Sequence, residues 1–514
     1  MVSERQQPPK DPDFLTYSSY PSKAEGKTRI IVVGAGIIGV CVTYYITRHP
    51  KFDPKKHFIT ILESKRVAGG ASGKAGGLLA LWAFPQQIVP LSFKLHQELA
   101  EEYNGEKEWG YRRLTTISVE GDISNKDQKV EVEQREEVEE EGEGDDVGED
   151  KISAKRPSRA ASANTAAIKK NSIEMKSTHP SENRLPSGLK WIDPGFINDW
   201  SLLGDESTTA QVHPYQFTTF MLKKCLETGS VELVIGKAED IILDEDSGEC
   251  KGVIYKPSGA KAEYNESYNE KVELLGDKVV MSIGPWTSKI LPDCPISGLR
   301  AHSILIKPQK MDLITPHAVF TELKLGKHKF VSPEIYSRKD EVYVCGEGDS
   351  SVLIPETTDD VEVVTEKCDE LFSFVSKISS NLAHGKVVKR QACYLPVLDI
   401  PSSSGPLIGE TNLENLILAS GHSCWGINNA PATGLLVSEI LLDGEAKSCD
   451  ISALDPSLYF DASLIYDDDE DDENSDEGDE SDDEEDDEDD DGGDDDDYEY
   501  RESTEEEADE EADE

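Results

Sequence analysis

Short apolar runs alternate with segments of helical spacing from residue 29 to about residue 119, a pattern typical of an α/β fold. Residues 29–33 (RIIVV) form a continuous apolar run rich in β-branched side chains, as expected for a buried parallel strand. A helix should follow and end near Arg48, just before a proline. Residues 57–62 (HFITIL) predict the next strand, so the folded chain should begin with a βαβ unit.

The pattern breaks between residues 120 and 190. Residues 120–150 contain 15 acidic and 3 basic side chains, and residues 151–190 contain 9 basic and 2 acidic ones with many serines and alanines. Neither block has enough large apolar side chains to offset the entropy lost on ordering. We therefore expect a disordered insertion over 120–190, with a solvated helix over 129–141 as the alternative.

The two ends of the chain also differ from the folded part. Residues 1–27 are polar, and we expect a disordered leader without the apolar stretch of a secretory signal. Residues 467–514 contain 35 acidic side chains and one basic one, and such a segment cannot fold alone. This acidic tail carries -34 of the formal charge of -52, so the rest of the chain is only mildly acidic.

Three glycines follow the first predicted strand directly, in the spacing Gly34-x-Gly36-x-x-Gly39. The first glycine permits a tight turn, the second lets backbone approach a pyrophosphate, and the third lets helix and strand pack closely. Glu63 lies 24 residues after Gly39, where an acid should accept hydrogen bonds from ribose hydroxyls. This order predicts a dinucleotide site, to which we also assign Ile37, Ile38 and Ser64.

A second glycine-rich stretch, residues 68–80 (AGGASGKAGGLLA), follows soon after the acid. Such a loop brings backbone close to a long, flat cofactor, which favours FAD over NAD; a flexible surface loop is the alternative. The cofactor contacts expected from this stretch are Ala71, Ser72, Gly76, Gly77 and Leu78.

A third candidate segment lies near the end of the folded part. Residues 416–419 predict a strand, and residues 430–442 have helical apolar spacing, so residues 421–429 should form a loop that leads into a helix N-terminus. A helix N-terminus can stabilise the negative charge that a flavin gains on reduction. A structural loop with a helix cap is the alternative. The expected contacts are His422, Ser423, Cys424, Trp425, Gly426, Ile427 and Asn428.

These segments resemble the D-amino-acid oxidase superfamily of FAD-dependent oxidoreductases, which includes glycine oxidase and sarcosine oxidase. Residues 212–214 with the following helix, residues 231–238 and residues 278–287 resemble further family segments, and residues 405–434 (GPLIGETNLENLILASGHSCWGINNAPATG) resemble its terminal signature. The resemblance places Ala238, Gly284 and Trp286 at the cofactor. It is greatest to a fungal branch linked to late-endosome transport and to sensitivity to topoisomerase I damage.

The resemblance implies an α/β fold with a Rossmann-like FAD-binding domain and a second lobe, built on a mixed β-sheet, that binds substrate. We assign residues 28–119, 191–289 and 404–462 to the FAD-binding domain and residues 290–403 to the substrate lobe. The disordered insertion and the acidic tail lie outside both.

Flavin oxidation needs little acid–base chemistry from the protein, because the flavin accepts the hydride. Lys74 stands where relatives often carry a basic residue near the flavin; a surface lysine is the alternative. His422 follows the glycine of the terminal signature; a structural core histidine is the alternative. The nine cysteines stand singly, which argues against a metal site and against a disulfide framework.

Two departures from the family pattern bear on the substrate and on the flavin linkage. Tyr394 stands where amino-acid-oxidising relatives carry the arginine that grips the substrate carboxylate, while Arg390 is out of register and Arg300 is a substitute. A simple α-amino acid is therefore in doubt as substrate. Cys393 is one residue away from the position that links FAD covalently in sarcosine oxidases, so we expect non-covalent FAD.

The favoured function is oxidation of a small amine, amino-acid-like or imino compound by hydride transfer to FAD. The alternative is a flavoprotein that acts chiefly as a trafficking or scaffold factor between late endosome and Golgi. The acidic tail suits a basic protein partner and repels nucleic acid, or it serves solubility alone. No apolar run is long enough to span a membrane, and we expect a cytoplasmic protein associated with late endosomes.

Overall fold

The computed structural model describes residues 12, 14–24, 26–124, 185–186, 188–258, 270–401, 403 and 405–463. The chain divides into two compact units, Met1–Ile465 and Tyr466–Glu514, and every described residue belongs to the first. The acidic tail, most of the predicted insertion and the start of the leader lie outside the described residues.

The predicted leader and insertion are both too long. Ser18 pairs with Val234, and its amide donates to the carbonyl of Leu233, so part of the leader adds backbone hydrogen bonds to a sheet. At the insertion, a strand continues to Asp122, and Leu189 is 4% exposed in a hydrophobic core. Long-range pairing and burial stabilise these short stretches, and neither is visible in local composition.

The first large sheet has the strand order β10-β9-β8-β2-β1-β11-β19-β18. The run from β8 to β19 is parallel, while β9, β10 and β18 pair antiparallel. The predicted βαβ unit is present. Its strands are β1 (Thr28–Val33), β2 (His57–Glu63), β8 (Val231–Leu243), β9 (Cys250–Pro257), β10 (Val272–Leu275), β11 (Lys278–Met281), β18 (Leu407–Glu410) and β19 (Leu416–Ser420).

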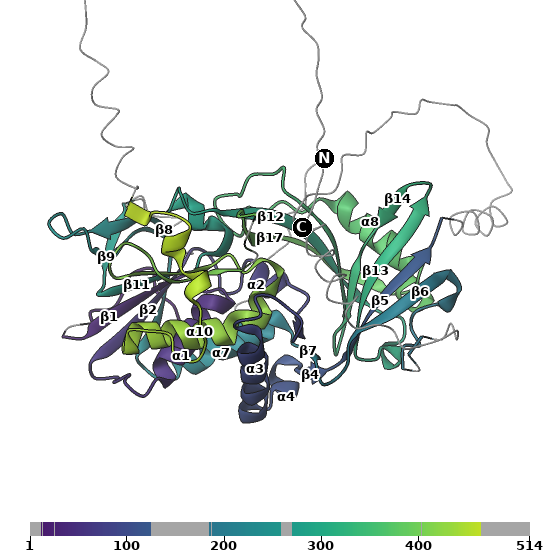
Figure 1. The fold of residues 1–514 in the computed structure, drawn as a ribbon, viewed down its shortest axis with the longest axis horizontal. Coiled ribbons are helices and arrows are strands. Elements are labelled where there is room, and N and C mark those ends of the chain that lie inside the picture. The colour runs from purple at the N-terminus through teal and green to yellow at the C-terminus, as the bar shows by residue number, and fades with distance from the viewer. Residues whose placement is uncertain are drawn as a thin grey trace, which may run out of the picture. The chain divides into compact units, whose positions relative to one another are not determined.

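Both faces of this parallel run are buried, which explains why its strands read as continuous apolar segments. Side chains alternate across a strand, so Ile30 and Val32 pack on one face while Ile31 and Val33 pack on the other. Helices α1 (Ile37–Arg48), α7 (Pro214–Leu226) and α10 (Gly426–Asp443) form the layer on the first face (Figure 1). Residues of β9 and β10 contribute to the core on the opposite face.

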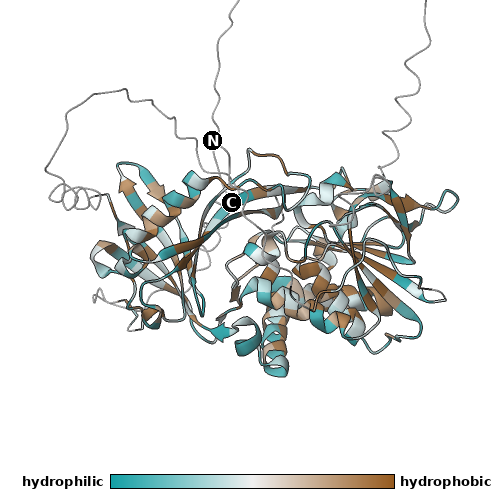
Figure 2. Ribbon diagram, turned by 180° about the vertical axis from the view of Figure 1, so that it is seen from behind, coloured by the Kyte–Doolittle hydropathy of each residue, from teal (hydrophilic) through white to brown (hydrophobic). Residues whose placement is uncertain are grey.

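The second large sheet is mixed, with the order β17-β12-β16-β15-β13-β5-β6 and β14 beside β13. One pair, β5 and β13, is parallel. Figure 2 shows hydrophobic residues along the strands of both large sheets. The strands are β5 (Thr115–Asp122), β6 (Ile197–Gly204), β12 (Ile296–Lys307), β13 (His317–Gly326), β14 (Lys329–Val331), β15 (Glu334–Ser337), β16 (Val342–Asp349) and β17 (Lys386–Leu398).

The α/β fold with a second mixed sheet is confirmed, but the boundary between the lobes needs correction. Residues 115–119 and 197–204 were assigned to the FAD-binding domain, whereas β5 and β6 are hydrogen-bonded into the second sheet. Their partner β13 is far away in sequence, so strand pattern alone does not reveal the pairing. Helix α8 (Thr365–Ser376) packs on one face of this sheet through Cys368, Leu371 and Val375.

A small third sheet and several short helices complete the described residues. In this part of the chain no helix is long and apolar enough to cross a membrane. The third sheet contains β3 (Leu78–Ala80), β7 (Thr209–Gln211) and β4 (Arg112–Arg113). The remaining α-helices are α2 (Ala71–Lys74), α3 (Val89–Tyr103), α4 (Gly105–Trp109) and α9 (Ser380–Ala383). The 3-10 helices are Pro194–Phe196, Gly284–Lys289, Met311–Leu313, Ser423–Trp425, Ser452–Leu454 and Pro456–Leu458.

Helices α1 and α10 pack closely because Gly434 has no side chain. A Cβ on Gly434 would lie 2.6 Å from the backbone carbonyl carbon and oxygen of Cys41, which cannot move without shifting α1. We predict that Gly434→Ala lowers the free energy of unfolding by about 1–3 kcal/mol, the usual effect of overpacking. Urea denaturation measures this change, with Gly326→Ala as the control because a Cβ there meets no atom within 4 Å. Equal stability of the two variants would contradict the close helix contact.

Candidate functional site

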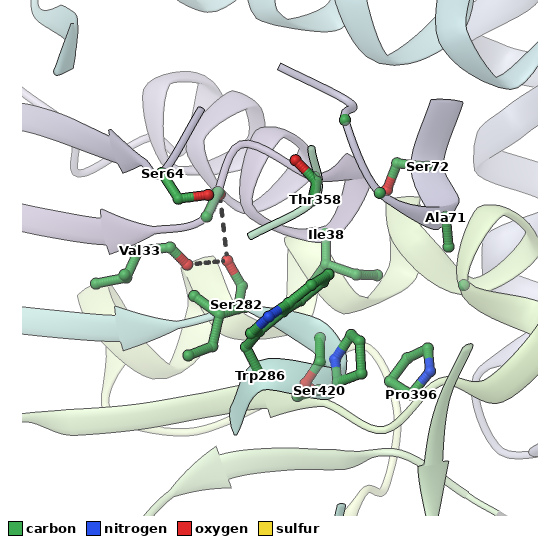
Figure 3. Close-up of a pocket in the computed structure, with 18 of the residues that line it drawn as sticks. Val33, Ile38, Ser64, Ala71, Ser72, Ser282, Trp286, Thr358, Pro396 and Ser420 are labelled. Carbon is green, nitrogen blue, oxygen red and sulfur yellow. Dashed lines mark hydrogen bonds between the residues drawn. The ribbon is translucent and has the colours of Figure 1, made fainter. Parts of the chain in front are cut away.

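A pocket lies at the carboxyl edge of the parallel strands, where ligands of open α/β sheets usually bind. It holds about 1250 Å³ of free space, part of it open to solvent. Val33, Glu63 and Ser420, at the ends of β1, β2 and β19, contribute to its wall. Figure 3 shows that residues from several distant segments surround it, among them Ser72, Trp286 and Pro396. The pocket therefore joins the sheet edge of the first lobe to strand β17 of the second.

The first glycine motif forms the turn between β1 and α1. Gly34 has φ +102°, and a Cβ there would lie 2.7 Å from the carbonyl oxygen of Ser282, so only glycine fits. A Cβ on Gly39 would lie 2.1 Å from the carbonyl oxygen of Gly34, which confirms its predicted packing role. Gly36 lines the pocket and precedes α1 without a side-chain cap, while the Ile37 amide donates to the Ser72 hydroxyl at 2.9 Å. The positive end of the helix dipole thus faces the pocket.

Glu63 closes β2, as expected for the acid of a dinucleotide site. Its side chain is 7% exposed, lines the pocket, and accepts hydrogen bonds from the amides of Ala35 at 2.9 Å and Lys65 at 3.0 Å. Burial raises the pKa of Glu63, and these hydrogen bonds partly oppose the shift by favouring the charged form. The carboxylate is therefore held in one position next to Ser64.

The second glycine-rich stretch forms α2 and leads into β3. Ala71, Ser72 and Ala75 line the pocket, whereas the expected contacts Gly76, Gly77 and Leu78 do not. Chain direction explains the difference, because the stretch turns toward the second sheet after Ala75. A Cβ on Gly76 would lie 2.3 Å from the Tyr336 ring, and the side chain of Leu78 packs in the same cluster as Tyr336.

The terminal signature begins its helix earlier than expected. A 3-10 turn covers Ser423–Trp425 and α10 starts at Gly426, so the predicted loop 421–429 is helical from residue 423. Two expected contacts, Trp425 and Asn428, face away from the pocket. Trp425 packs on Trp82, and the Asn428 side-chain oxygen accepts from the Ala80 amide at 2.9 Å. The lining residues of this segment are His422, Ser423, Cys424, Gly426 and Ile427.

The opposite wall includes Trp286 and a segment that the sequence did not single out, residues 350–364 between β16 and α8. The indole nitrogen of Trp286 donates to the carbonyl oxygen of Pro355 at 2.7 Å. Glu356 forms ion pairs with Lys237 and Lys289 across the pocket wall. Segment 350–364 of the second lobe is thus attached to several residues that line the pocket.

The remaining predicted contacts and several unpredicted residues also lie at the pocket. Ala238, Gly284 and Ile38 line it as expected. Ser282 directly follows an apolar strand beside the glycine turn, so its place could have been inferred from strand order. No sequence pattern indicated four other lining residues, because contacts between the lobes bring them to the pocket: Lys237, Lys289, Glu356 and Thr358.

The comparisons with known proteins agree with this geometry. The family described as FAD dependent oxidoreductase, DAO, matches residues 29–440. The Saccharomyces cerevisiae protein named "Putative oxidoreductase TDA3" is 49% identical over 522 residues, covering 88% of this chain and 99% of that protein. This chain belongs to the DAO family of FAD dependent oxidoreductases.

Solved structures of DAO-type folds cover most of the chain. Iminodiacetate oxidase from Chelativorans sp. BNC1 has a TM-score of 0.56 at 15% identity, over 83% of this chain and 99% of that chain. Glycine oxidase from Geobacillus kaustophilus has a TM-score of 0.56 at 15% identity, over 84% of this chain and 100% of that chain. At this identity the likeness shows the fold.

The cofactor of this DAO-family chain is FAD, and the pocket residues fit it. At Gly34 and Gly36 no side chain covers the backbone beside the N-terminus of α1, where a pyrophosphate would be held. Glu63 would accept the ribose hydroxyls. The segment from His422 to Ile427, together with Leu395 and Pro396, forms the part of the wall near the second lobe, where the flavin ring would lie.

The two predicted catalytic residues have structural partners in this DAO-family fold. The Lys74 ammonium donates to the carbonyl oxygen of Ala392 at 3.0 Å, and burial lowers the pKa of Lys74. His422 is 3% exposed and lies 3.0 Å from the Thr433 hydroxyl, and burial lowers the pKa of His422 to about 3. Lys74 connects the two lobes, and His422 stays neutral beside the flavin end of the pocket.

The arginine proposed as a substitute for the family's carboxylate clamp has other partners. Arg300 is 4% exposed and pairs with Asp349 at 3.2 Å and with Glu362 at 2.9 Å. Tyr394, which stands at the family's arginine position, donates its hydroxyl to the carbonyl oxygen of Leu353 at 3.0 Å. Two carboxylates therefore already neutralise Arg300.

We predict that Gly36→Val weakens the binding of FAD, and so lowers the flavin content of the purified protein, without unfolding the chain. A Cβ there would lie 3.2 Å from the Ser72 hydroxyl, which can give way, but valine would also fill the space left for the pyrophosphate. Overpacking of about 1–3 kcal/mol corresponds to roughly tenfold to hundredfold weaker binding. The ratio of flavin to protein absorbance measures the loss, with Gly326→Val as control. Full flavin content in Gly36→Val would contradict the assignment.

Folding stability should depend on pH through His96, whose ring nitrogen lies 2.8 Å from the Ile427 carbonyl oxygen. Burial lowers the pKa of His96 to about 4, so the unfolded chain binds a proton near pH 6.5 that the folded chain excludes. We predict that this term removes about 3 kcal/mol of stability as pH falls from about 6.5 to about 4. In His96→Gln the unfolding free energy should fall less steeply with decreasing pH, by a slope that corresponds to the uptake of up to one proton on unfolding. Identical slopes in chemical denaturation would show that His96 does not contribute.

Proposed function

We propose that this FAD-dependent oxidoreductase oxidises a carbon–nitrogen bond of a small amine, amino-acid-like or imino compound. The observation that carries the proposal is the course of the pocket wall, from Glu63 at the sheet edge to Cys424, Leu395 and Pro396. A dinucleotide bound at Glu63 would place its flavin between the first lobe and strand β17. A substrate would then lie between the flavin and the second sheet.

The activities of two structural neighbours support a carbon–nitrogen bond as the reacting group. One neighbour is an iminodiacetate oxidase and another is a glycine oxidase. Fold likeness alone does not transfer an activity, so the support from this chain is its own pocket.

A bound flavin would accept a hydride from the substrate carbon. The protein's contribution is positioning and electrostatics. The N-terminal end of α10, at Gly426 and Ile427, carries a partial positive charge that would favour negative charge on a flavin bound beside it. Packing of Trp82 against Trp425 limits the access of water behind this segment.

The ion pairs that Arg300 already makes favour a substrate that is not a simple α-amino acid. A guanidinium already paired with Asp349 and Glu362 gives little further stabilisation to a substrate carboxylate. Candidates are therefore amines or imino compounds whose binding does not need a carboxylate clamp. Non-covalent attachment of FAD, a trafficking role for the acidic tail and a late-endosome association stay predictions.

Anaerobic flavin reduction tests the proposal directly. We expect at least one member of a panel of primary amines, N-methyl amino acids and imino acids to bleach the visible flavin absorbance of the purified chain, because the hydride has no other acceptor. Alcohols and hydroxy acids of matched size serve as controls. Bleaching by hydroxy compounds alone, or by none of the panel, would contradict oxidation of a carbon–nitrogen bond.

A further inference from the structure

One face of the second sheet is turned toward the flavin end of the pocket and carries a carboxylate. Glu334 pairs with Phe320 on β13 and with Cys345 on β16, and Tyr336 pairs with Tyr343. Residues two apart on a strand share a face, so Glu334, Tyr336 and their cross-strand partners point the same way. Helix α8 packs with the opposite set of side chains, which includes Ile335 and Val344.

Contacts with the first lobe show that this face lies near the flavin end. A Cβ on Gly76 would lie 2.3 Å from the Tyr336 ring and 3.1 Å from the Tyr343 ring, and Gly76 follows the lining residue Ala75. Cys424 lines the pocket and keeps accessible surface there, although protein atoms enclose its thiol. This enclosure, and secondly the nearby Glu334 carboxyl, raises the pKa of the Cys424 thiol to about 12.

Glu334 has hydrogen-bond donors but no counter-charge. It accepts from the Tyr336 hydroxyl and, at 3.7 Å, from the Cys345 thiol. Among the described residues, no lysine, arginine or histidine forms an ion pair with it; Lys74 donates to the Ala392 carbonyl and Arg338 pairs with Glu341. Glu334 nevertheless keeps accessible surface. Burial raises the pKa of Glu334, because a largely desolvated carboxylate without a cation is costly. A cation bound beside Glu334 would offset that cost and favour the charged form.

The side chains around Glu334 are aromatic and pack on one another, and the Arg338 guanidinium already lies over the Tyr343 ring, 4.9 Å from its centroid. Tyr336 stacks on Tyr343 with ring centroids 5.8 Å apart, and Phe320 meets Tyr336 edge-on at 6.0 Å. Trp82 meets Phe320 at 6.1 Å and extends the row toward Trp425. A carboxylate beside several aromatic rings is the combination that recognises alkylammonium groups.

We propose that Glu334 and the adjacent aromatic residues form a cation subsite, so that the substrate is an amine carrying a positive charge rather than a carboxylate-anchored amino acid. The inference rests on the amine oxidation proposed above and names the substrate class. The alkylammonium group lies against the Tyr336 and Phe320 rings and pairs with the Glu334 carboxylate. Arg300 is already paired with two acids and does not pair with Glu334.

The test compares the binding of tetramethylammonium with that of its neutral analogue tert-butanol and its anionic analogue pivalate. The FAD-loaded full chain is titrated, and broadening of each probe's methyl resonance gives its dissociation constant without turnover. We expect tetramethylammonium to bind about tenfold or more tightly than tert-butanol, and pivalate to bind most weakly, because one charge pairing with a desolvated carboxylate exceeds 1.4 kcal/mol. Glu334→Gln should reduce the affinity for tetramethylammonium to that of tert-butanol.

Glu120→Gln is the matched control, because Glu120 lies exposed on β5 of the same sheet; it should leave all three affinities unchanged. Equal affinities for cation and alcohol in the wild-type chain, or an unchanged affinity in Glu334→Gln, would overturn the subsite. The wild-type comparison decides the question if the variant fails to fold. Flavin reduction by amines is read separately. Reduction without Glu334-dependent cation binding removes this inference alone, whereas cation binding without any reduction removes the proposed function alone.

Discussion

The contact between the β1–α1 turn and its neighbours is the constraint on which the site depends. A Cβ on Gly39 would lie 2.1 Å from the carbonyl oxygen of Gly34. A Cβ on Gly34 would lie 2.7 Å from the carbonyl oxygen of Ser282. Three segments therefore meet with backbone against backbone. The Ser282 hydroxyl donates to the Val33 carbonyl at 2.7 Å and holds the ends of β1 and β11 together. Because no side chain separates these segments, the N-terminus of α1 and the carboxyl edge of the sheet both lie at the pocket.

The second sheet is held to this edge by contacts that also shape the pocket. Lys74 donates to Ala392 on β17, Gln391 donates back to the Lys74 carbonyl at 3.1 Å, and Arg338 donates to the Ala75 carbonyl. Segment 350–364 adds the bond from Trp286 to Pro355 and the ion pairs of Glu356. The exposed ion pairs contribute little on their own, so position rather than stability is the main effect of Glu356. One part of the glycine-rich stretch thus lines the pocket, and the next part packs against the second sheet.

Local signals predicted the nucleotide end of the site. A buried parallel strand, a glycine turn and a following acid are properties of neighbouring residues, and Gly34, Gly39 and Glu63 occupy the expected positions. The second lobe was less predictable, because β5 pairs with β13 across a long sequence separation. The start of α10 at Gly426 was missed because the helical apolar spacing was recognised only from residue 430 onward. Arg300 and Glu334 show the same limit: their charges are visible in the sequence, whereas their partners are set by strand register.

The contacts of Tyr394 and Arg300 explain what these two residues do around the position where the family carries a carboxylate-binding arginine. Tyr394 and Arg300 are opposite each other on β17 and β12, and both are engaged with the 349–362 region. The place where a carboxylate clamp was expected therefore supports segment 350–364. On the neighbouring strands Glu334 has no cationic partner among the described residues, and burial raises its pKa. The proposed subsite therefore offers a carboxyl group where an enzyme that grips a carboxylate would offer an arginine.

Segments near residues 34, 72 and 424 should together bind one FAD. The decisive measurement is an equilibrium titration of the purified full chain with FAD, followed by flavin fluorescence and visible absorbance. We expect saturation at one FAD per chain, with the spectrum of an enclosed flavin. A folded chain that contains no flavin and takes up none at saturating FAD would contradict it.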